Sequence, residues 1–185
     1  NKIKTTLSAE KLDMPFRIRI FRAAVISVLL YGCETWMVTA PITEKLDIFA
    51  RKCYRHMLGV KQQAARMTNK ALYQQIGERP ISATLRARQL QFVGHCIRMD
   101  ADEPVNRLIL YEPHVAPAWR KGGDRRTYRH QISSYILPGE KLLEESEIRG
   151  MAANRDEWKR LIAVPGKKKH RISPKSVRPP PLPCA

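Results

Sequence analysis

The stretch from Pro41 to Gly59 repeats its apolar residues at helical spacing, and this pattern restricts the fold more than any other feature. The residues at i, i+3, i+4, i+7 and i+11 are Leu46, Phe49, Ala50, Cys53 and Met57. Such spacing puts them on one side of an α-helix, with Lys45, Lys52 and Arg55 largely outside the stripe. Pro41 favours the start of a helix, and Gly59 favours its end. We therefore expect an amphipathic helix that buries one face.

Similar periodicity predicts helices along most of the chain. The expected ranges are 15–31, 41–58, 68–76, 82–99, 105–111, 126–136 and 144–163. Gly32 and Gly77 follow two of them as C-terminal stops, and Thr68 or Asn69 can cap the third. Because 43% of the residues are apolar, the chain can bury a core. The sequence predicts an all-α fold.

The chain carries a formal charge of +17, which favours phosphate-rich partners. No acid lies between Arg79 and Arg98, although exposed helix faces usually mix both signs. On the helix expected there, Arg88, Gln91, His95 and Arg98 form one polar stripe. We prefer nucleic acid to a membrane surface as the partner, because no segment is typical of an interfacial helix.

Searches for catalytic and metal motifs exclude several functions. The chain has no phosphate-binding loop, no dinucleotide fingerprint and no zinc spacing, so we predict no catalytic and no metal-binding residue. Cys33 next to Glu34 is better explained by packing than by nucleophilic chemistry, since no base is near in sequence. None of the four cysteines forms a C-x-x-C pair, and we expect reduced thiols. The longest apolar run is too short for a membrane span, and no signal-peptide layout is present, which predicts an intracellular protein, nuclear or cytoplasmic.

Four blocks together resemble a known family. They are FRAAVISVLLYGCETWMVT, LDIFARKCYRHMLGV, LYQQIGERPISATLRARQLQFVGHCIRM and AANRDEWKRLI. In this order, over about residues 15–163, they are similar to the thumb and C-terminal connection region of reverse transcriptases of non-long-terminal-repeat (LINE-type) retrotransposons. The chain begins at Asn1 within this pattern, so we expect a fragment.

The resemblance implies a thumb-like helical segment over 1–60 and a helical connection region over 61–164. The basic, proline-rich stretch 165–185 is expected to be a disordered tail. The implied function is part of an RNA-directed DNA polymerase that grips the template–primer or element RNA. The family's paired palm aspartates are absent, so the chain should be inactive alone. Magnesium belongs to that missing palm, and no cofactor is expected here. The implied partners are RNA, an RNA–DNA hybrid or DNA, and the palm itself.

The candidates for backbone phosphate contact are the basic residues of the first three long helices. They are Arg17, Arg19, Arg22, Lys52, Arg55, Arg86, Arg88, His95 and Arg98. The alternative for each is an exposed, solubilising charge. Two other functions remain open at this point: a stand-alone basic helical module derived from such an element, and a protein-interaction module whose tail, Pro179 to Pro183, docks as a polyproline helix.

Overall fold

The computed structural model describes residues 12–60, 67–112, 127–139 and 142–163, and every regular element within these ranges is helical. The all-α prediction is confirmed. The elements are α2 (Met14–Phe21), the π-helical η1 (Arg22–Ile26), α3 (Ser27–Leu29), the 3₁₀ turn η2 (Cys33–Thr35), α4 (Ala40–Met57), α5 (Asn69–Ile76), α6 (Ile81–Ile97), α7 (Pro104–Leu108), α8 (Tyr128–Ile136), α9 (Glu145–Ala153) and α10 (Arg155–Ile162). The predicted tail, 165–185, lies outside the described residues.

The helix boundaries follow local chemistry where the sequence marks it. Thr68 caps α5, its side-chain oxygen accepting a hydrogen bond from the Ala71 backbone N–H at 3.2 Å. Gly77 then ends α5 with a φ of 71°, a left-handed conformation that glycine adopts without strain. Both predicted ends of this helix are confirmed.

The prediction of a single helix over 144–163 is wrong, because this range contains two helices, α9 and α10. Asn154 has extended backbone angles and separates α9 from α10. Its side-chain oxygen accepts hydrogen bonds from the backbone N–H groups of Asp156 and Glu157, at 3.2 and 3.3 Å. Asparagine is a strong N-cap, and the two acids that follow suit the first turn of a new helix. The apolar periodicity continued through the break and concealed it.

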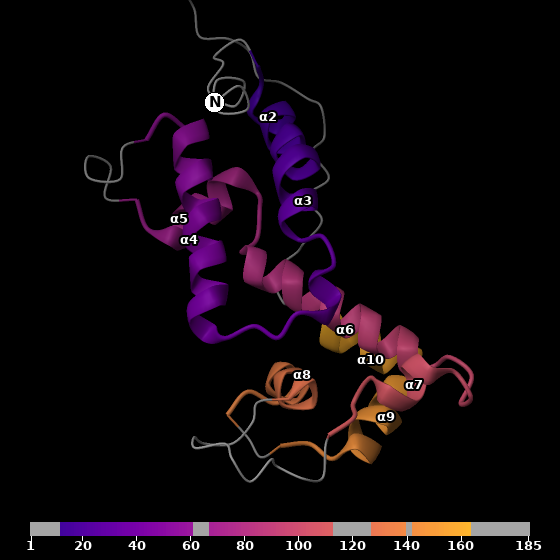
Figure 1. Cartoon of the computed structure of the whole chain (residues 1–185). Coiled ribbons are helices and arrows are strands. Elements are labelled where there is room, and N and C mark those ends of the chain that lie inside the picture. The colour runs from indigo at the N-terminus through magenta and orange to yellow at the C-terminus, as the bar shows by residue number, and fades with distance from the viewer. Residues whose placement is uncertain (1–11, 61–66, 113–126, 140–141, 164–185) are drawn as a thin grey trace, which may run out of the picture.

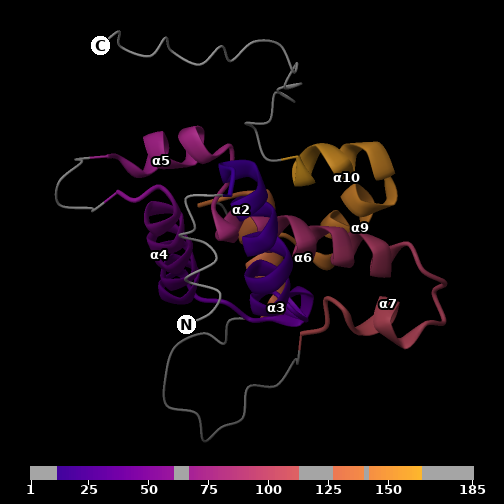
Figure 2. The ribbon, with the colours of Figure 1, turned by 90° about the horizontal axis from the view of Figure 1, so that it is seen from above.

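Helix α6 is the centre of the molecule (Figures 1 and 2). It contacts α4 and η2 on one side and α7, α8, α9 and α10 on the other. Two hydrophobic cores meet along it: Leu85 belongs to the core built with α2, α4 and α5, and Leu90 to the core built with α8, α9 and α10. The first core therefore reaches past residue 60, into α5 and the start of α6. The domain boundary expected at residue 60 stays a prediction.

Helices α6 and α10 cross at very close range. Trp158 is 1% exposed, and its indole Nε1 donates a hydrogen bond to the carbonyl of Leu90 at 2.7 Å. An ideal Cβ added to Gly94 would lie 2.2 Å from that Nε1 atom. Only glycine leaves room for the indole here, so the glycine of one sequence block and the tryptophan of another fit together.

The segment after α3, which contains Gly-Cys-Glu-Thr-Trp, is held by buried glutamines. Gln89 of α6 is fully buried, and its Nε2 donates to the carbonyls of Cys33 and Trp36 at 2.8 and 2.9 Å. Its Oε1 accepts from Gln131 Nε2 of α8 at 2.7 Å. Because buried amides are costly unless paired, this network fixes the path of the chain between α3 and α4.

Packing is also the role of Cys33 itself. The side chain is fully buried in the first core. Burial, followed by the nearby charge of Glu34, raises the pKa of its thiol. A raised pKa keeps the group protonated and therefore a poor nucleophile. No disulfide joins Cys33, Cys53 or Cys96, the cysteines within the described ranges.

Candidate nucleic-acid interface

The side of α4 that points away from the core combines cations with apolar groups. We call it the α4 outer face, and its residues, all exposed, are Pro41, Ile42, Lys45, Ile48, Phe49, Lys52 and His56. At 18 residues, α4 is about 27 Å long. Phe49 was expected in the buried stripe, but it is 41% exposed because the core contacts α4 through Ala50, Tyr54 and Met57 instead.

The acids of α4 point elsewhere. Glu44 forms an ion pair with Arg51, which lies about two helical turns further along α4. Asp47 is 8% exposed and holds the start of α6, accepting from the backbone N–H of Ser82 at 3.0 Å and from its hydroxyl at 2.6 Å. Both carboxylates of α4 therefore have partners other than Lys45 and Lys52.

Four of the predicted arginines make contacts that the sequence did not reveal, since each donates to a backbone carbonyl near the C-terminal end of another helix. Arg17 reaches Met57 at 2.7 Å, Arg86 reaches Tyr135, Arg88 reaches Leu30 at 3.1 Å, and Arg98 reaches Ala152 at 2.7 Å. The C-terminal end of a helix leaves carbonyls without intrahelical partners and carries a partial negative charge. A guanidinium there donates a hydrogen bond to such a carbonyl, and its positive charge is attracted to the helix end. These arginines join helices together in addition to any role at the surface.

The other predicted residues fall into two groups. Arg55 is 8% exposed and donates to Asn69 Oδ1 at 2.8 Å, joining α4 to α5. Arg22 is exposed and pairs with Glu78. Arg19 lies over the Phe16 ring, with 5.8 Å between the guanidinium carbon and the ring centroid. His95 and Lys52 are exposed.

The structure thus does not bring the nine candidates together on one surface. Arg19 lies near the end of α2 and Arg22 begins η1. Lys52 belongs to the α4 outer face, whereas His95 lies in the last turn of α6 and Arg98 follows its end. Lys45 and His56, which face outward beside Lys52, were not among the candidates. Lys45 lies seven residues before Lys52 and His56 lies four residues after it, so helical spacing places all three on one face. This spacing is the sequence signal that would have identified them.

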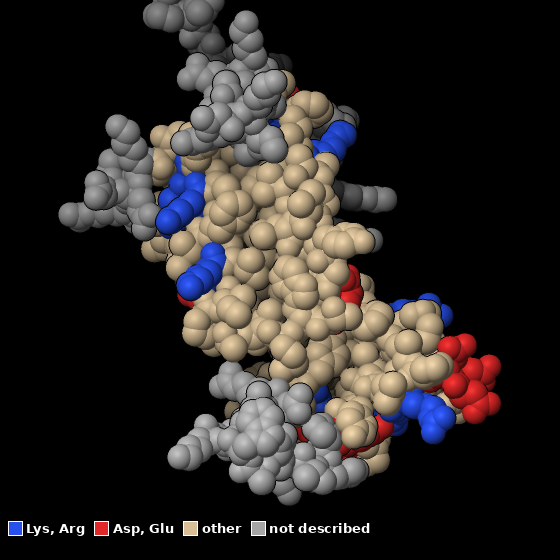
Figure 3. Space-filling model, viewed as in Figure 1, with Lys and Arg blue, Asp and Glu red and all other residues tan. Residues whose placement is uncertain are grey.

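Charge is distributed unevenly over the molecule. In Figure 3, Lys and Arg lie over α4 and near α2, whereas at the opposite end, beside α7, Asp and Glu gather together with further Lys and Arg. The exposed acids there are Asp100, Asp102 and Glu103.

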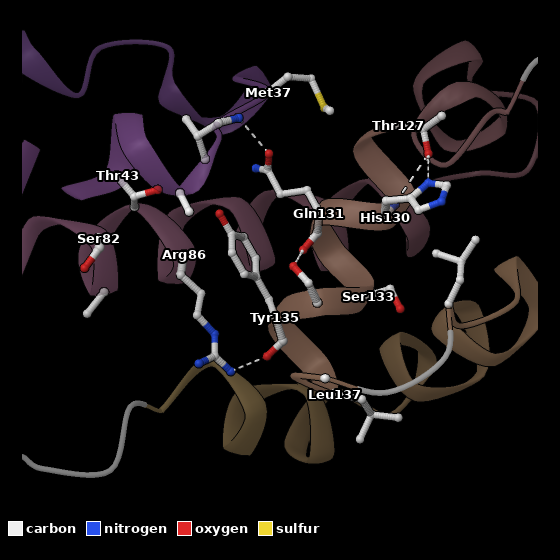
Figure 4. Close-up of a pocket in the computed structure, with 16 residues that line it drawn as sticks. Met37, Thr43, Ser82, Arg86, Thr127, His130, Gln131, Ser133, Tyr135 and Leu137 are labelled. Carbon is white, nitrogen blue, oxygen red and sulfur yellow. Dashed lines mark hydrogen bonds between the residues drawn. The ribbon is translucent and has the colours of Figure 1, made fainter. Parts of the chain in front are cut away.

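A hollow of about 690 Å³ lies between α4, α6 and α8 (Figure 4). Arg86 lines this hollow. Its guanidinium donates to the Tyr135 carbonyl and lies 5.9 Å from the centroid of the Tyr135 ring. The hydroxyls of Thr43 and Ser134 already donate to backbone carbonyls at 2.7 Å. Burial raises the pKa of Tyr135 to about 12, so its hydroxyl stays protonated and donates to Gln89 Oε1. These groups support the fold, and we assign them no ligand.

Next to this hollow, Glu112 is held in its charged form. Burial alone would raise its pKa, but the hydrogen bond from the Thr127 hydroxyl and the charges of Arg129 and His130 lower it. The Thr127 hydroxyl lies 2.6 Å from Glu112 Oε1, and His130 Nδ1 lies 3.1 Å from the same oxygen. The cluster fastens the start of α8 to the chain after α7.

Across the described ranges, no group of three or more His, Cys, Asp or Glu side chains is placed to hold a metal ion. No helix in those ranges is long and apolar enough to cross a membrane. Comparison with protein-family models, with curated proteins and with solved structures finds no match. The fold and the surface together define an all-α protein with a cationic helix face.

Proposed function

We propose that this chain is the thumb and C-terminal connection region of a LINE-type reverse transcriptase and that it grips a template–primer duplex without catalysing polymerisation. The binding part of the proposal rests on the α4 outer face. There Lys45 and Lys52 stand among apolar side chains, and the acids of α4, Glu44 and Asp47, have other partners. Lysines at such positions contact backbone phosphates, and the contact carries no sequence information. We further propose an intracellular setting, in the nucleus or cytoplasm.

The apolar groups of the α4 outer face suit a nucleic acid as well. Ile42, Ile48 and Phe49 are partly exposed between the lysines, at 44%, 37% and 41%. Sugar rings and base edges in a groove offer apolar surface flanked by phosphates. Self-association through this face is disfavoured, because it would bring the lysines of two copies together.

The proposal that the chain belongs to this family is supported by the packing between the four sequence blocks that resemble it. Gln89 of the third block holds the carbonyls of the first block's Cys33 and Trp36. Gly94 of the third block receives Trp158 of the fourth. The residues that carry the resemblance are therefore paired with one another in the fold.

The α3 end of the molecule suits contact with a palm. Val28 is 73% exposed, and Tyr31 is 84% exposed. Large apolar side chains in adjacent exposed positions commonly mark an interaction site. We propose that a polymerase palm covers them.

The test compares Lys45→Ala/Lys52→Ala with the unchanged full chain in binding a blunt RNA–DNA hybrid duplex across a salt series. Losing two phosphate contacts should reduce the salt slope by about 1.8 and the affinity near 0.15 M salt by roughly thirtyfold. The matched control is Arg107→Ala/Arg160→Ala, which removes two exposed cations from α7 and α10 and changes the net charge equally. If the control loses as much affinity as the α4 variant, the α4 outer face is not the contact surface.

A further inference from the structure

A groove between α6 and α10 gathers basic side chains from three separate parts of the sequence. Its volume is about 480 Å³, within the usual range of about 300–1,000 Å³ for ligand sites. Four cations line it: Arg79 before α6, Arg98 after α6, and Arg155 and Lys159 of α10. Gln91 is also in the wall, and none of the described residues that line the groove is Asp or Glu.

Nearby acids do not neutralise these cations. Glu78 pairs with Arg22 on the first helix. Asp156 approaches Lys159 at 3.3 Å, but both side chains are more than 60% exposed, and such surface pairs are worth little. Arg98 donates one Nη1–H to the carbonyl of Ala152 and keeps its remaining donors.

Four like charges around a concave surface create a positive potential, which walls of low polarity strengthen. Trp158, Ile162 and Ala87 form the apolar part of the wall. Because Trp158 is 1% exposed, it offers no face on which a base could stack. The groove therefore favours phosphates and does not distinguish bases.

The spread of the cations along α6 favours a strand over a single phosphate. Arg79 and Arg98 lie beyond opposite ends of α6, whose 17 residues span about 26 Å. Cations so far apart contact different phosphates of one strand and not a single phosphate group. A duplex as a whole cannot enter a hollow of about 480 Å³, whereas the backbone of one strand can lie along it.

We propose that the α6–α10 groove binds the sugar–phosphate backbone of single-stranded nucleic acid, separately from the duplex contact on α4. The inference rests on the proposed function, since both surfaces take nucleic acid as their ligand. Arg79, Arg98, Arg155 and Lys159 supply the phosphate contacts. Gln91 supplies a neutral donor near the middle of α6.

The test measures binding of a mixed-sequence single-stranded DNA oligonucleotide by the full chain and by Arg155→Ala/Lys159→Ala. Two lost contacts to a single strand should reduce the salt slope by about 1.4 and the affinity near 0.15 M salt by roughly tenfold. Arg107→Ala/Arg160→Ala is again the charge-matched control and should lose less than threefold. Blunt RNA–DNA hybrid should bind the groove variant as it binds the control.

Three results would overturn the inference. The first is equal loss of single-strand affinity in the groove variant and the control. The second is an equal loss of hybrid and single-strand affinity in the groove variant, which would remove the preference for a strand. The third is displacement of the oligonucleotide by inorganic tripolyphosphate as effectively as by unlabelled strand at equal phosphate concentration. If hybrid binding still depends on Lys45 and Lys52 in these cases, the proposed function stands without the groove.

Discussion

Replacing Gly94 by alanine tests the crossing of α6 and α10. The new Cβ would lie 2.2 Å from Trp158 Nε1 and 2.5 Å from Cδ1, and both atoms belong to a rigid, buried ring. Overpacking costs about 1–3 kcal/mol, and moving the indole also loses its hydrogen bond to Leu90, worth about 1 kcal/mol. Because alanine has a higher helix propensity than glycine, the substitution offsets about 1 kcal/mol of this cost. We expect Gly94→Ala to lower the free energy of unfolding by about 1–3 kcal/mol.

The assay is urea unfolding followed by far-ultraviolet circular dichroism, with Gly150→Ala as the matched control. Gly150 lies within α9, is exposed, and has no atom within 4 Å of an added Cβ. The control substitution should therefore stabilise the protein by about 0.5–1 kcal/mol. If Gly94→Ala were as stable as Gly150→Ala, the close approach of Trp158 to α6 would be refuted.

Further predictions concern stability and pH. Arg88→Ala should destabilise by about 1.5–3 kcal/mol because a charged donor to a helix-end carbonyl is lost, whereas Lys52→Ala should stay within about 0.5 kcal/mol, both by urea unfolding. Gln89→Leu should cost about 2–4 kcal/mol, since it leaves several buried polar groups unpaired; a neutral result would contradict the network. The lowered pKa of Glu112 stabilises the fold above about pH 4.3 and ceases to do so as pH falls through the folded-state pKa. Glu112→Gln should therefore flatten the loss of stability measured below about pH 5.

Much of the fold was predictable because local signals carry it. Thr68 and Gly77 marked the ends of α5, and the apolar spacing marked α4 and α6. The break at Asn154 was missed because the apolar pattern runs through it, although Asn followed by two acids is itself a cap signal. The exposure of Phe49 was also missed. Periodicity shows which residues form the apolar stripe of a helix, but not which side of that stripe contacts the core.

The site was less predictable than the fold, for a physical reason. Charge and spacing show that an arginine is on a helix, but not that a carbonyl lies within its reach. Arg88 donates to Leu30, 58 positions away in sequence, and Arg98 to Ala152, 54 positions away. Gathering Arg98 with Arg155 in one groove likewise depends on how α6 and α10 cross.

Lysine footprinting by acetylation and mass spectrometry tests the central claim most directly. The full chain is labelled with and without a saturating amount of blunt RNA–DNA hybrid duplex. We predict that the duplex protects Lys45 and Lys52 on the α4 outer face and leaves Lys159, in the α6–α10 groove, as reactive as before. Unchanged reactivity of Lys45 and Lys52 while the duplex is bound would contradict the proposal that α4 grips nucleic acid.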